Sequence, residues 1–307
     1  MLFHEPHFIL NPYTGAVIED PQIQRVHQKK ARAFNRRRFL QLGLVGTFGF
    51  SSVSAAWSEG HAFGLSRHRV GLLGLEKPLR LVQLTDLHFG FWHGPEQVRR
   101  WVDATLKLEP DLIVLTGDLV DRLPSLEGLE QLAHELKRLH APLGVFAVLG
   151  NHDYWRGSAE VTTSDLVMEL EQVGLKFLNN SSVDLRSDFS LAGIDDFLLG
   201  FPKLDLALTH LPTQGASVLL SHNPDVLPQV PSRVGLTLSG HTHGGQIRAP
   251  FGVGLYSISK YGERFQQGFV QGDLGARGFV SRGLGTGGLP LRTFCPAELV
   301  LLELTPA

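Results

Sequence analysis

The sequence is poor in cysteine, and that scarcity narrows the chemistry it can hold. Cys295 is the only cysteine among 307 residues, which excludes an internal disulfide framework and a metal site built on several thiolates. Any metal must therefore be bound mainly by nitrogen and oxygen ligands. The chain has 14 histidines for that purpose, so their placement along the sequence is informative.

A strong charge of either sign is also lacking. The formal net charge is −2, and no basic excess creates the long-range field that nucleic-acid-binding proteins use. We therefore expect no nucleic acid as a partner.

Charged residues are absent from residues 39–57, directly after a basic run. Three arginines at positions 36–38 precede this stretch, and small residues at 53–55 lie near its end. A basic start, an apolar segment and a small-residue end are typical of an export signal. The arginines and the Phe-Leu pair after them resemble the twin-arginine signal, which directs folded proteins to their export machinery. The alternative is a buried helix behind a solvated basic face.

The uncharged stretch is also about as long as the shortest membrane-spanning helix, roughly 17 residues, so membrane association through residues 39–57 stays open. We predict an N-terminal extension with a signal or anchor over residues 1–57, a linker over 58–65 and one folded domain over 66–307. The domain would then be exported, to the periplasm or the extracytoplasmic face of the membrane. About 35 residues precede the arginines, which is long for the start of a signal.

Apolar runs alternate with helical patterns from residue 79 onward. Strands that alternate with helices predict an α/β sheet covered on both faces. The expected helices are residues 95–108, 126–138 and 164–173, and the expected strands are 79–85, 111–116, 144–149, a short one ending near 194, 216–220, 234–239, 279–281 and 299–304.

Polar side chains follow five of these strands, at the point where each strand ends. Open α/β sheets bind their ligands beyond the carboxyl ends of the strands. Pairs of these residues lie two apart and project to one side of an extended backbone, and neighbouring glycines allow close approach. The candidate metal ligands are Asp86, His88, Asp118, Asn151, His222, His241 and His243.

Each motif alone has a simpler explanation, such as an Asx turn, a helix cap or a core histidine. Their joint occurrence, in order and each after a strand, favours a metal centre. With Asp118 shared, the set suffices for two divalent ions. Imidazole, carboxylate and amide ligands suit Mn, Fe or Zn and do not separate these metals.

The ordered motifs resemble the calcineurin-like metallophosphoesterase superfamily over nearly everything from residue 66 to the end of the chain. Residues 281–298 resemble its bacterial cell-envelope branch, whose members often carry a twin-arginine signal and act as phosphodiesterases. The resemblance implies a four-layered α/β/β/α sandwich, two metal ions and a phosphate-ester substrate. The long N-terminal extension departs from the family pattern.

The resemblance also implies roles for the site residues. One metal would be bound by Asp86, His88 and His243. The other would be bound by Asn151, His222 and His241. Asp118 would bridge the two ions. The catalytic set would be His152 beside the substrate, Asp153 as its orienting partner, and Asn151.

Several alternatives stay open beside an envelope phosphodiesterase. They are a phosphomonoesterase, a hydrolase of lipid-linked pyrophosphates similar to UDP-2,3-diacylglucosamine hydrolases, and a non-catalytic, membrane-tethered metal-binding module. Arg292 is expected to form a surface salt bridge rather than a phosphate clamp, and Arg282 could do either. Cys295 is expected to be a small buried hydrophobe.

Overall fold

The computed structural model describes residues 62–157, 160–212, 215–250, 254 and 256–307, and two short strands near the N-terminus. These strands, β1 (Ile9–Leu10) and β2 (Val17–Ile18), pair antiparallel within a unit that is separate from residues 56–307. The export segment predicted at residues 36–57 lies outside the described residues. None of the helices in the described part of the chain has the length and apolar character needed to span a bilayer.

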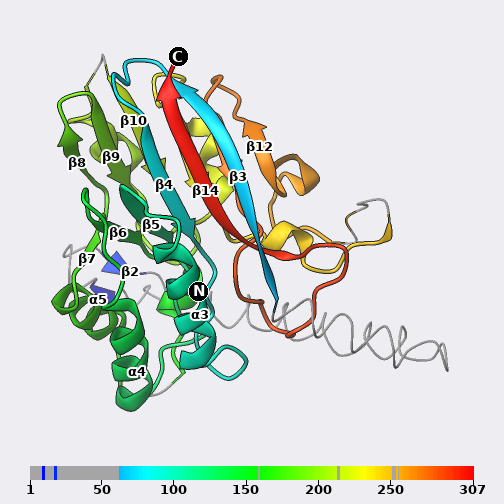
Figure 1. Cartoon of the computed structure of the whole chain (residues 1–307). Helices are drawn as coiled ribbons and strands as arrows, with labels where there is room; N and C mark the ends of the chain where they lie inside the picture. The colour runs from blue at the N-terminus through cyan, green and yellow to red at the C-terminus, as the bar shows by residue number, and fades with distance from the viewer. Residues whose placement is uncertain are drawn as a thin grey trace, which may run out of the picture. The chain divides into compact units, whose positions relative to one another are not determined.

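Two six-stranded sheets form the larger unit (Figure 1). The first sheet has the order β3 (Phe63–Leu72), β14 (Ala297–Pro306), β4 (Leu79–Leu84), β5 (Leu112–Thr116), β6 (Val145–Val148), β7 (Leu175–Phe177). The second sheet has the order β12 (Gly268–Gln271), β13 (Arg277–Val280), β11 (Leu236–Ser239), β10 (Ala216–Leu220), β9 (Phe189–Gly193), β8 (Ser181–Arg186). Strands β4 to β7 are parallel, as are β9, β10, β11 and β13.

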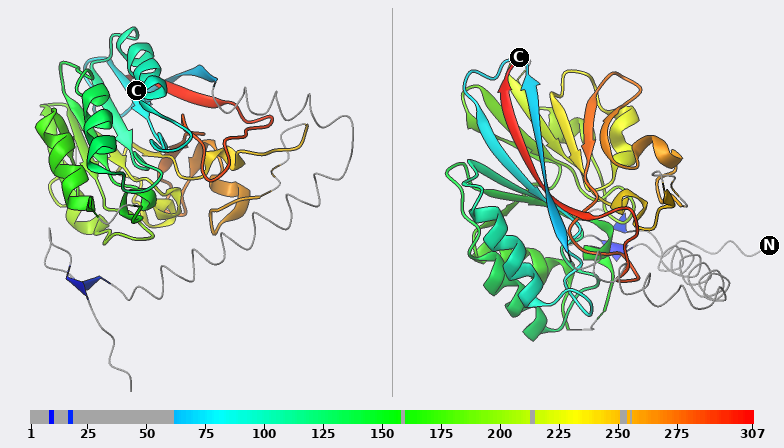
Figure 2. Two further views of the ribbon diagram at one scale, coloured as in Figure 1. Left: turned by 90° about the horizontal axis from the view of Figure 1, so that it is seen from below. Right: turned by 45° about the vertical axis from the view of Figure 1, so that its right-hand side comes forward.

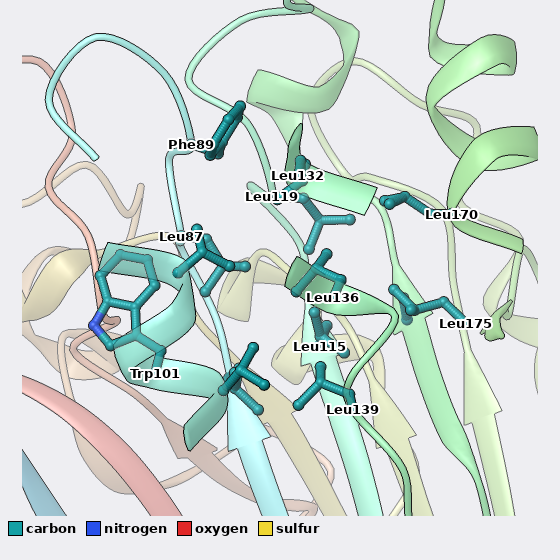
Figure 3. Packing of buried hydrophobic residues seen from close by; sticks show 14 of the residues in the cluster. Leu87, Phe89, Trp101, Leu115, Leu119, Leu132, Leu136, Leu139, Leu170 and Leu175 are labelled. Carbon is teal, nitrogen blue, oxygen red and sulfur yellow. The ribbon is translucent and has the colours of Figure 1, made fainter. Parts of the chain in front are cut away.

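Alternating side chains of the first sheet build two separate cores. In β5, Leu112 and Val114 belong to the core shared with β9 and β10, whereas Ile113 and Leu115 belong to the core shared with the helices. Those helices are α3 (Pro95–Leu106), α4 (Leu126–Leu136) and α5 (Thr163–Gln172), which gather on one side of the molecule (Figure 2). Figure 3 shows their packing, in which Trp101 of α3 and Leu132 of α4 belong to one cluster with Leu115 of β5.

A third core covers the other face of the second sheet. It joins β9 and β10 to α6 (Leu204–Leu208) and the short 3-10 helix η2 (Pro224–Gln229). The layers are therefore helix, sheet, sheet and helix, which confirms the predicted α/β/β/α arrangement. The three longer helices also begin within a residue of the expected positions, because Pro95 occupies a helix start and Ser125 and Thr162 cap the other two.

Within the two large sheets, four strands had no counterpart in the sequence-based prediction: β3, β7, β8 and β12. All four are edges of the two sheets. Residues 63–65, expected to belong to a linker, are strand, because β3 pairs along its full length with β14. Its central residues 66–69 are Ser-Arg-His-Arg, and an exposed edge strand tolerates such polar residues. Because they interrupt the apolar pattern, the sequence did not predict this strand.

The carboxyl ends of the strands in both sheets meet at one place. Gly117 after β5 packs against Gly150 after β6 and against the ring of His222 after β10. Gly240 after β11 packs so closely on Asp86 and Thr85 that a Cβ there would overlap both side chains. This edge of the sandwich positions the candidate site.

Candidate metal centre

The seven candidate ligands converge at this edge, and each is at most 6% exposed. The first sheet contributes four: Asp86 and His88 after β4, Asp118 after β5, and Asn151 at the start of the 3-10 helix η1 (Asn151–Tyr154) after β6. The second sheet contributes three: His222 after β10, and His241 and His243 after β11. We call these seven residues the metal centre.

One half of the centre groups Asp86, His88 and His243, which offer ligand atoms within 4.8 Å of one another. The Nε2 atoms of His88 and His243 are 3.0 Å apart, and His243 Nε2 is 3.6 Å from Asp86 Oδ1. Two imidazole nitrogens and a carboxylate oxygen therefore face one small volume.

The other half groups Asp118, His222 and His241. His222 Nε2 is 3.2 Å from Asp118 Oδ2 and 3.2 Å from His241 Nδ1. His222 Nδ1 donates a hydrogen bond to the Thr116 carbonyl at 2.8 Å, so its Nε2 lone pair is directed into the centre. Such an outer hydrogen bond is what fixes the tautomer of a metal-binding histidine.

Asp118 connects the two halves. Its Oδ2 is 3.6 Å from His88 Nε2 in one half and 3.2 Å from His222 Nε2 in the other. Its Oδ1 accepts a hydrogen bond from the His152 backbone N–H at 2.8 Å, which holds the carboxylate in place. One carboxylate oxygen therefore faces a histidine of each group.

Asn151 supplies a direct test of whether these residues fit metal ions. Its Oδ1 is buried and finds no hydrogen-bond partner among the described residues. A buried amide oxygen without a partner costs about 1–3 kcal/mol, and a cation beside it removes that cost. The donor set of imidazole nitrogens, carboxylates and one amide oxygen suits divalent transition metals, so the residues fit.

Electrostatics within the centre point the same way. Burial alone would raise the pKa of Asp118, but the attraction of His222 holds it well below its usual range. Burial alone would lower the pKa of His222, but Asp118 raises it to about 10. Burial and the repulsion of His222 lower the pKa of His241 to about 3. In the metal-free chain a proton on His222 thus balances Asp118, and a cation can take its place.

The backbone of the centre is strained. A residue other than glycine rarely adopts φ near +50°, because of steric overlap, and such conformations cost on the order of 1–3 kcal/mol each. Nine non-glycine residues in the described part of the chain have positive φ, and five of them are predicted ligands: Asp86, His88, Asp118, His241 and His243. Strain concentrated on these residues indicates that their side-chain directions serve a function.

His152 lies at the centre and outside the two groups described above, but with His88 and Asp118 it forms a further group whose possible ligand atoms lie within 4.8 Å of one another. Its ring packs edge-on against His88, with 4.5 Å between centroids, and at a tilt of 38° against Trp155, with 3.8 Å between centroids. Its Nδ1 donates to the carbonyl of Asp121 at 2.7 Å, which leaves Nε2 for another partner. Burial lowers the pKa of His152 to about 4, so the ring is neutral near pH 7.

The structure does not place the Asp153 carboxylate against the His152 ring, as the predicted orienting role would require. Its carboxylate accepts hydrogen bonds from the backbone N–H groups of Leu119, Val120 and Gly150, so it ties the loop after β5 to the loop after β6. Asp121 orients His152 instead. The sequence signal for Asp121 was available, because it closes the Gly-Asp-x-x-Asp motif three residues after Asp118.

Arg292 is neither a surface salt bridge nor a phosphate clamp. It is fully buried, and its guanidinium donates to the carbonyls of Arg282 at 2.7 Å, Gly285 at 2.6 Å and Cys295 at 3.1 Å. Its Nη2 is also 3.3 Å from His243 Nδ1. Arg292 therefore holds the loop before β14 together and supports a ligand.

Arg282 and Cys295 have structural surroundings as well. The Arg282 side chain forms a 2.7 Å ion pair with Glu298. Cys295 is buried, as predicted, and its thiol faces the His243 carbonyl. Of the aromatic residues near the motifs, Tyr154 donates to the carboxylate of Asp195.

A four-layered sandwich with a two-part His, Asp and Asn centre at its strand ends defines a metal-dependent hydrolase of phosphate esters. Residues 79–245 match the family model described as calcineurin-like phosphoesterase, and the chain belongs to this family.

Curated relatives agree with that assignment. The chain is 30% identical to the uncharacterized metallophosphoesterase YkuE of Bacillus subtilis, over 89% of this chain and 98% of that protein. It is 36% identical to the uncharacterized metallophosphoesterase Cj0846 of Campylobacter jejuni, over 76% of this chain and 61% of that longer protein. It is 28% identical to the UDP-2,3-diacylglucosamine pyrophosphatase LpxG of Chlamydia trachomatis, over 73% of this chain and 83% of that protein.

Proposed function

We propose that this phosphoesterase is a phosphodiesterase of the cell envelope that uses two divalent ions. The observation that carries the two-ion reading is the Asp118 carboxylate, whose Oδ2 faces a histidine in each half of the centre. Three residues would hold one ion: Asp86, His88 and His243. Three would hold the other: Asn151, His222 and His241. Asp118 would contact both.

When bound, such an ion pair lowers the pKa of the attacking water and polarises the phosphoryl oxygens. The protein's own part is positioning. His152 is held through Nδ1 by the Asp121 carbonyl, so its Nε2 is the atom that can contact a phosphate oxygen or the leaving oxygen. A bound phosphate anion would favour the protonated ring, which is otherwise neutral. Proton transfer of this kind is typically worth about 10²–10⁴-fold in rate.

The test of substrate class compares two soluble esters on metal-supplemented protein. We expect Mn²⁺-dependent turnover of bis(p-nitrophenyl) phosphate at a higher kcat/KM than of p-nitrophenyl phosphate. The reverse order would make the protein a phosphomonoesterase. Metal-dependent turnover that is lost in Asn151→Ala would exclude a non-catalytic metal-binding module, whereas no turnover with any divalent metal would favour it.

A second candidate is hydrolysis of a lipid-linked pyrophosphate, supported by the likeness to LpxG. The export signal argues against it, because nucleotide-linked lipid precursors are made in the cytosol. Release of UMP from UDP-2,3-diacylglucosamine, at a kcat/KM above that for the soluble diester, would favour this candidate.

The envelope location is supported by residues 36–57, with their arginines followed by an uncharged stretch. Whether the segment is cleaved or kept as an anchor is decided by the mass of the exported protein. Replacement of Arg36 and Arg37 by lysine is expected to leave the protein in the cytosol, and unchanged export would contradict the twin-arginine assignment.

A further inference from the structure

We propose that the metal-centre end of the domain faces a lipid bilayer, with exposed aromatic side chains of two loops at the bilayer surface. The proposal rests on the envelope function proposed above and on residues 39–57 being kept as a membrane anchor rather than cleaved. Beyond that function, the proposal states how the site is oriented relative to the bilayer and which residues contact the lipid.

The first observation is the exposure of large aromatic side chains. Phe91 is 85% exposed, Phe294 is 57% exposed and Trp92 is 37% exposed. Phe91 and Trp92 pack edge-on, with 4.6 Å between their ring centroids. Large apolar groups that a fold leaves in water mark interaction surfaces when they gather, and tryptophan is enriched where membranes meet water.

Phe294 carries a second sign of function. Its φ is +50°, a conformation that is a genuine outlier for a bulky residue. Strain of this kind is normally offset by packing, yet Phe294 remains 57% exposed. The strained backbone therefore holds the ring outward instead of into the core.

Both loops border the metal centre. The loop of residues 89–94 follows His88 directly, and a Cβ at Gly90 would lie 3.3 Å from Cβ of Asp121, which orients His152. The loop of residues 282–296 packs through Gly283 on Asp86. His93 Nε2 lies 2.9 Å from Thr286 Oγ1, so the two loops are joined beside the site.

The chain also enters the domain at this end. Phe63, the first residue of β3, lies opposite Ala297, the first residue of β14, and β3 begins beside the loop that precedes β14 (Figure 1). Ser66 of β3 donates to Glu298, which pairs with Arg282, the neighbour of Gly283. The start of β3 is thus connected to Asp86 by a short series of contacts.

Connectivity then limits how the domain can lie. Six residue steps separate Trp57 from Phe63, a reach of at most about 20 Å. An anchor that ends at Trp57 would hold the metal-centre end this close to the bilayer. The opposite end lies a full strand away, about 33 Å for the ten residues of β3. Exposed apolar residues at that end, Leu73 and Leu274, are beyond the reach of the anchor.

The experiment uses the full chain in vesicles of phosphatidylglycerol and phosphatidylcholine with brominated acyl chains, which quench nearby tryptophan. The chain has four tryptophans, and each is changed to Phe in turn so that its emission is obtained by difference. Trp101 is the matched control, since it is fully buried in the domain. A Leu73→Trp change in the Trp92→Phe background reports on the opposite end.

We expect the bromines to remove most of the emission of Trp57 and Trp92, and to leave Trp101 and the tryptophan at position 73 unchanged. Quenching of Trp57 without quenching of Trp92 would overturn the orientation. Quenching at position 73 would overturn it as well. If neither Trp57 nor Trp92 is quenched, the anchor is absent and the inference falls with it. Turnover of the soluble diester is measured separately, so a failed phosphodiesterase assignment is distinguishable from each of these outcomes.

Discussion

Between the two sheets, side chains such as Leu81, Val114 and Leu191 are apolar and buried on extended strands. Just beyond the carboxyl ends of these strands, the buried side chains include carboxylates and imidazoles, most of them on residues with left-handed backbone. Apolar burial in the interior stabilises the folded domain. At the edge, backbone strain and buried charge destabilise it. Stability and chemistry are therefore located in different parts of one sandwich, and substitutions can separate them.

The largest effect is expected for Asp118→Asn. The change removes the charge that both halves of the centre share, so bound metal and activity should fall together. The loss should exceed about 100-fold, because even partners outside the ligand shell are typically worth 10–100-fold. Metal content by mass spectrometry and diester turnover measure it. Asp103→Asn on α3, with its side chain 42% exposed, is the control, and full activity in Asp118→Asn would refute the ligand assignment.

His152→Ala should come next. We expect kcat to fall by about 10²–10⁴-fold while metal content stays at the wild-type level, since the proposed ligand set does not include His152. Asp153→Asn should instead lower the thermal stability, because its carboxylate binds three backbone N–H groups. If Asp153→Asn reproduced the kinetic defect of His152→Ala at unchanged stability, the carboxylate would have the orienting role after all.

Leu191→Ala tests the interior. Its side chain is fully buried between the sheets, so its truncation should cost about 2–5 kcal/mol of the free energy of unfolding. Urea denaturation measures the loss. Activity per folded molecule should stay at the wild-type level, and a selective loss of metal would mean that the interior and the edge are coupled.

Arg292→Lys tests a buried residue that joins the loop of residues 282–296 to the ligand His243. Lysine keeps the charge but lacks the planar guanidinium, whose donors reach the separate carbonyls of this loop in fixed directions, so the loop of residues 282–296 should loosen around His243. We expect the metal affinity to fall by about 10–100-fold, as for other outer partners of metal ligands. Metal titration followed by activity is the measurement, with Arg277→Lys as the surface control. An unchanged affinity would leave Arg292 with a purely structural role.

The smallest effect is expected for Glu298→Gln. Burial alone would raise the pKa of Glu298, but its hydrogen bond and ion pair with Arg282 lower it. The folded-state pKa is thus below the unfolded value, and the stabilisation is present above about pH 4.3 and lost as the pH falls through the folded pKa. The variant should be about 1 kcal/mol less stable at pH 7 and should lose that part of the acid dependence. An unchanged acid dependence would show that the pair contributes nothing.

Central elements of the fold could be predicted from the sequence because their signals are local. Strand β5 reads Leu-Ile-Val-Leu-Thr and is buried at every position, so an unbroken apolar run identified it. The edge strands β3, β7, β8 and β12 carry no such run, because a strand with one neighbour is partly solvated and tolerates polar residues. Their pairing depends on partners far away in sequence, such as β14 for β3, which no local pattern contains.

The candidate site divides in the same way. The seven candidate ligands were identifiable because each follows a strand within a glycine-containing or His-rich motif. The residue that supports these ligands, Arg292, could not be identified in this way. It acts through backbone carbonyls, which every sequence provides. Asp153 was assigned to its neighbour in sequence, whereas its carboxylate turns away to bind the loop after β5.

Strand β14 is made after every other described strand of the two sheets, and it lies between β3 and β4, the first two strands of the domain. The first sheet therefore cannot be completed while residues 297–306 are still in the exit tunnel, however long ago its other members emerged. Translation proceeds at about 5–20 residues per second. Strand β3 of the nascent domain therefore stays without its partner β14 for many seconds. A message truncated before codon 297 would yield a chain whose opening strand has no neighbour, and such a product should be cleared by proteases rather than accumulate as a shortened enzyme.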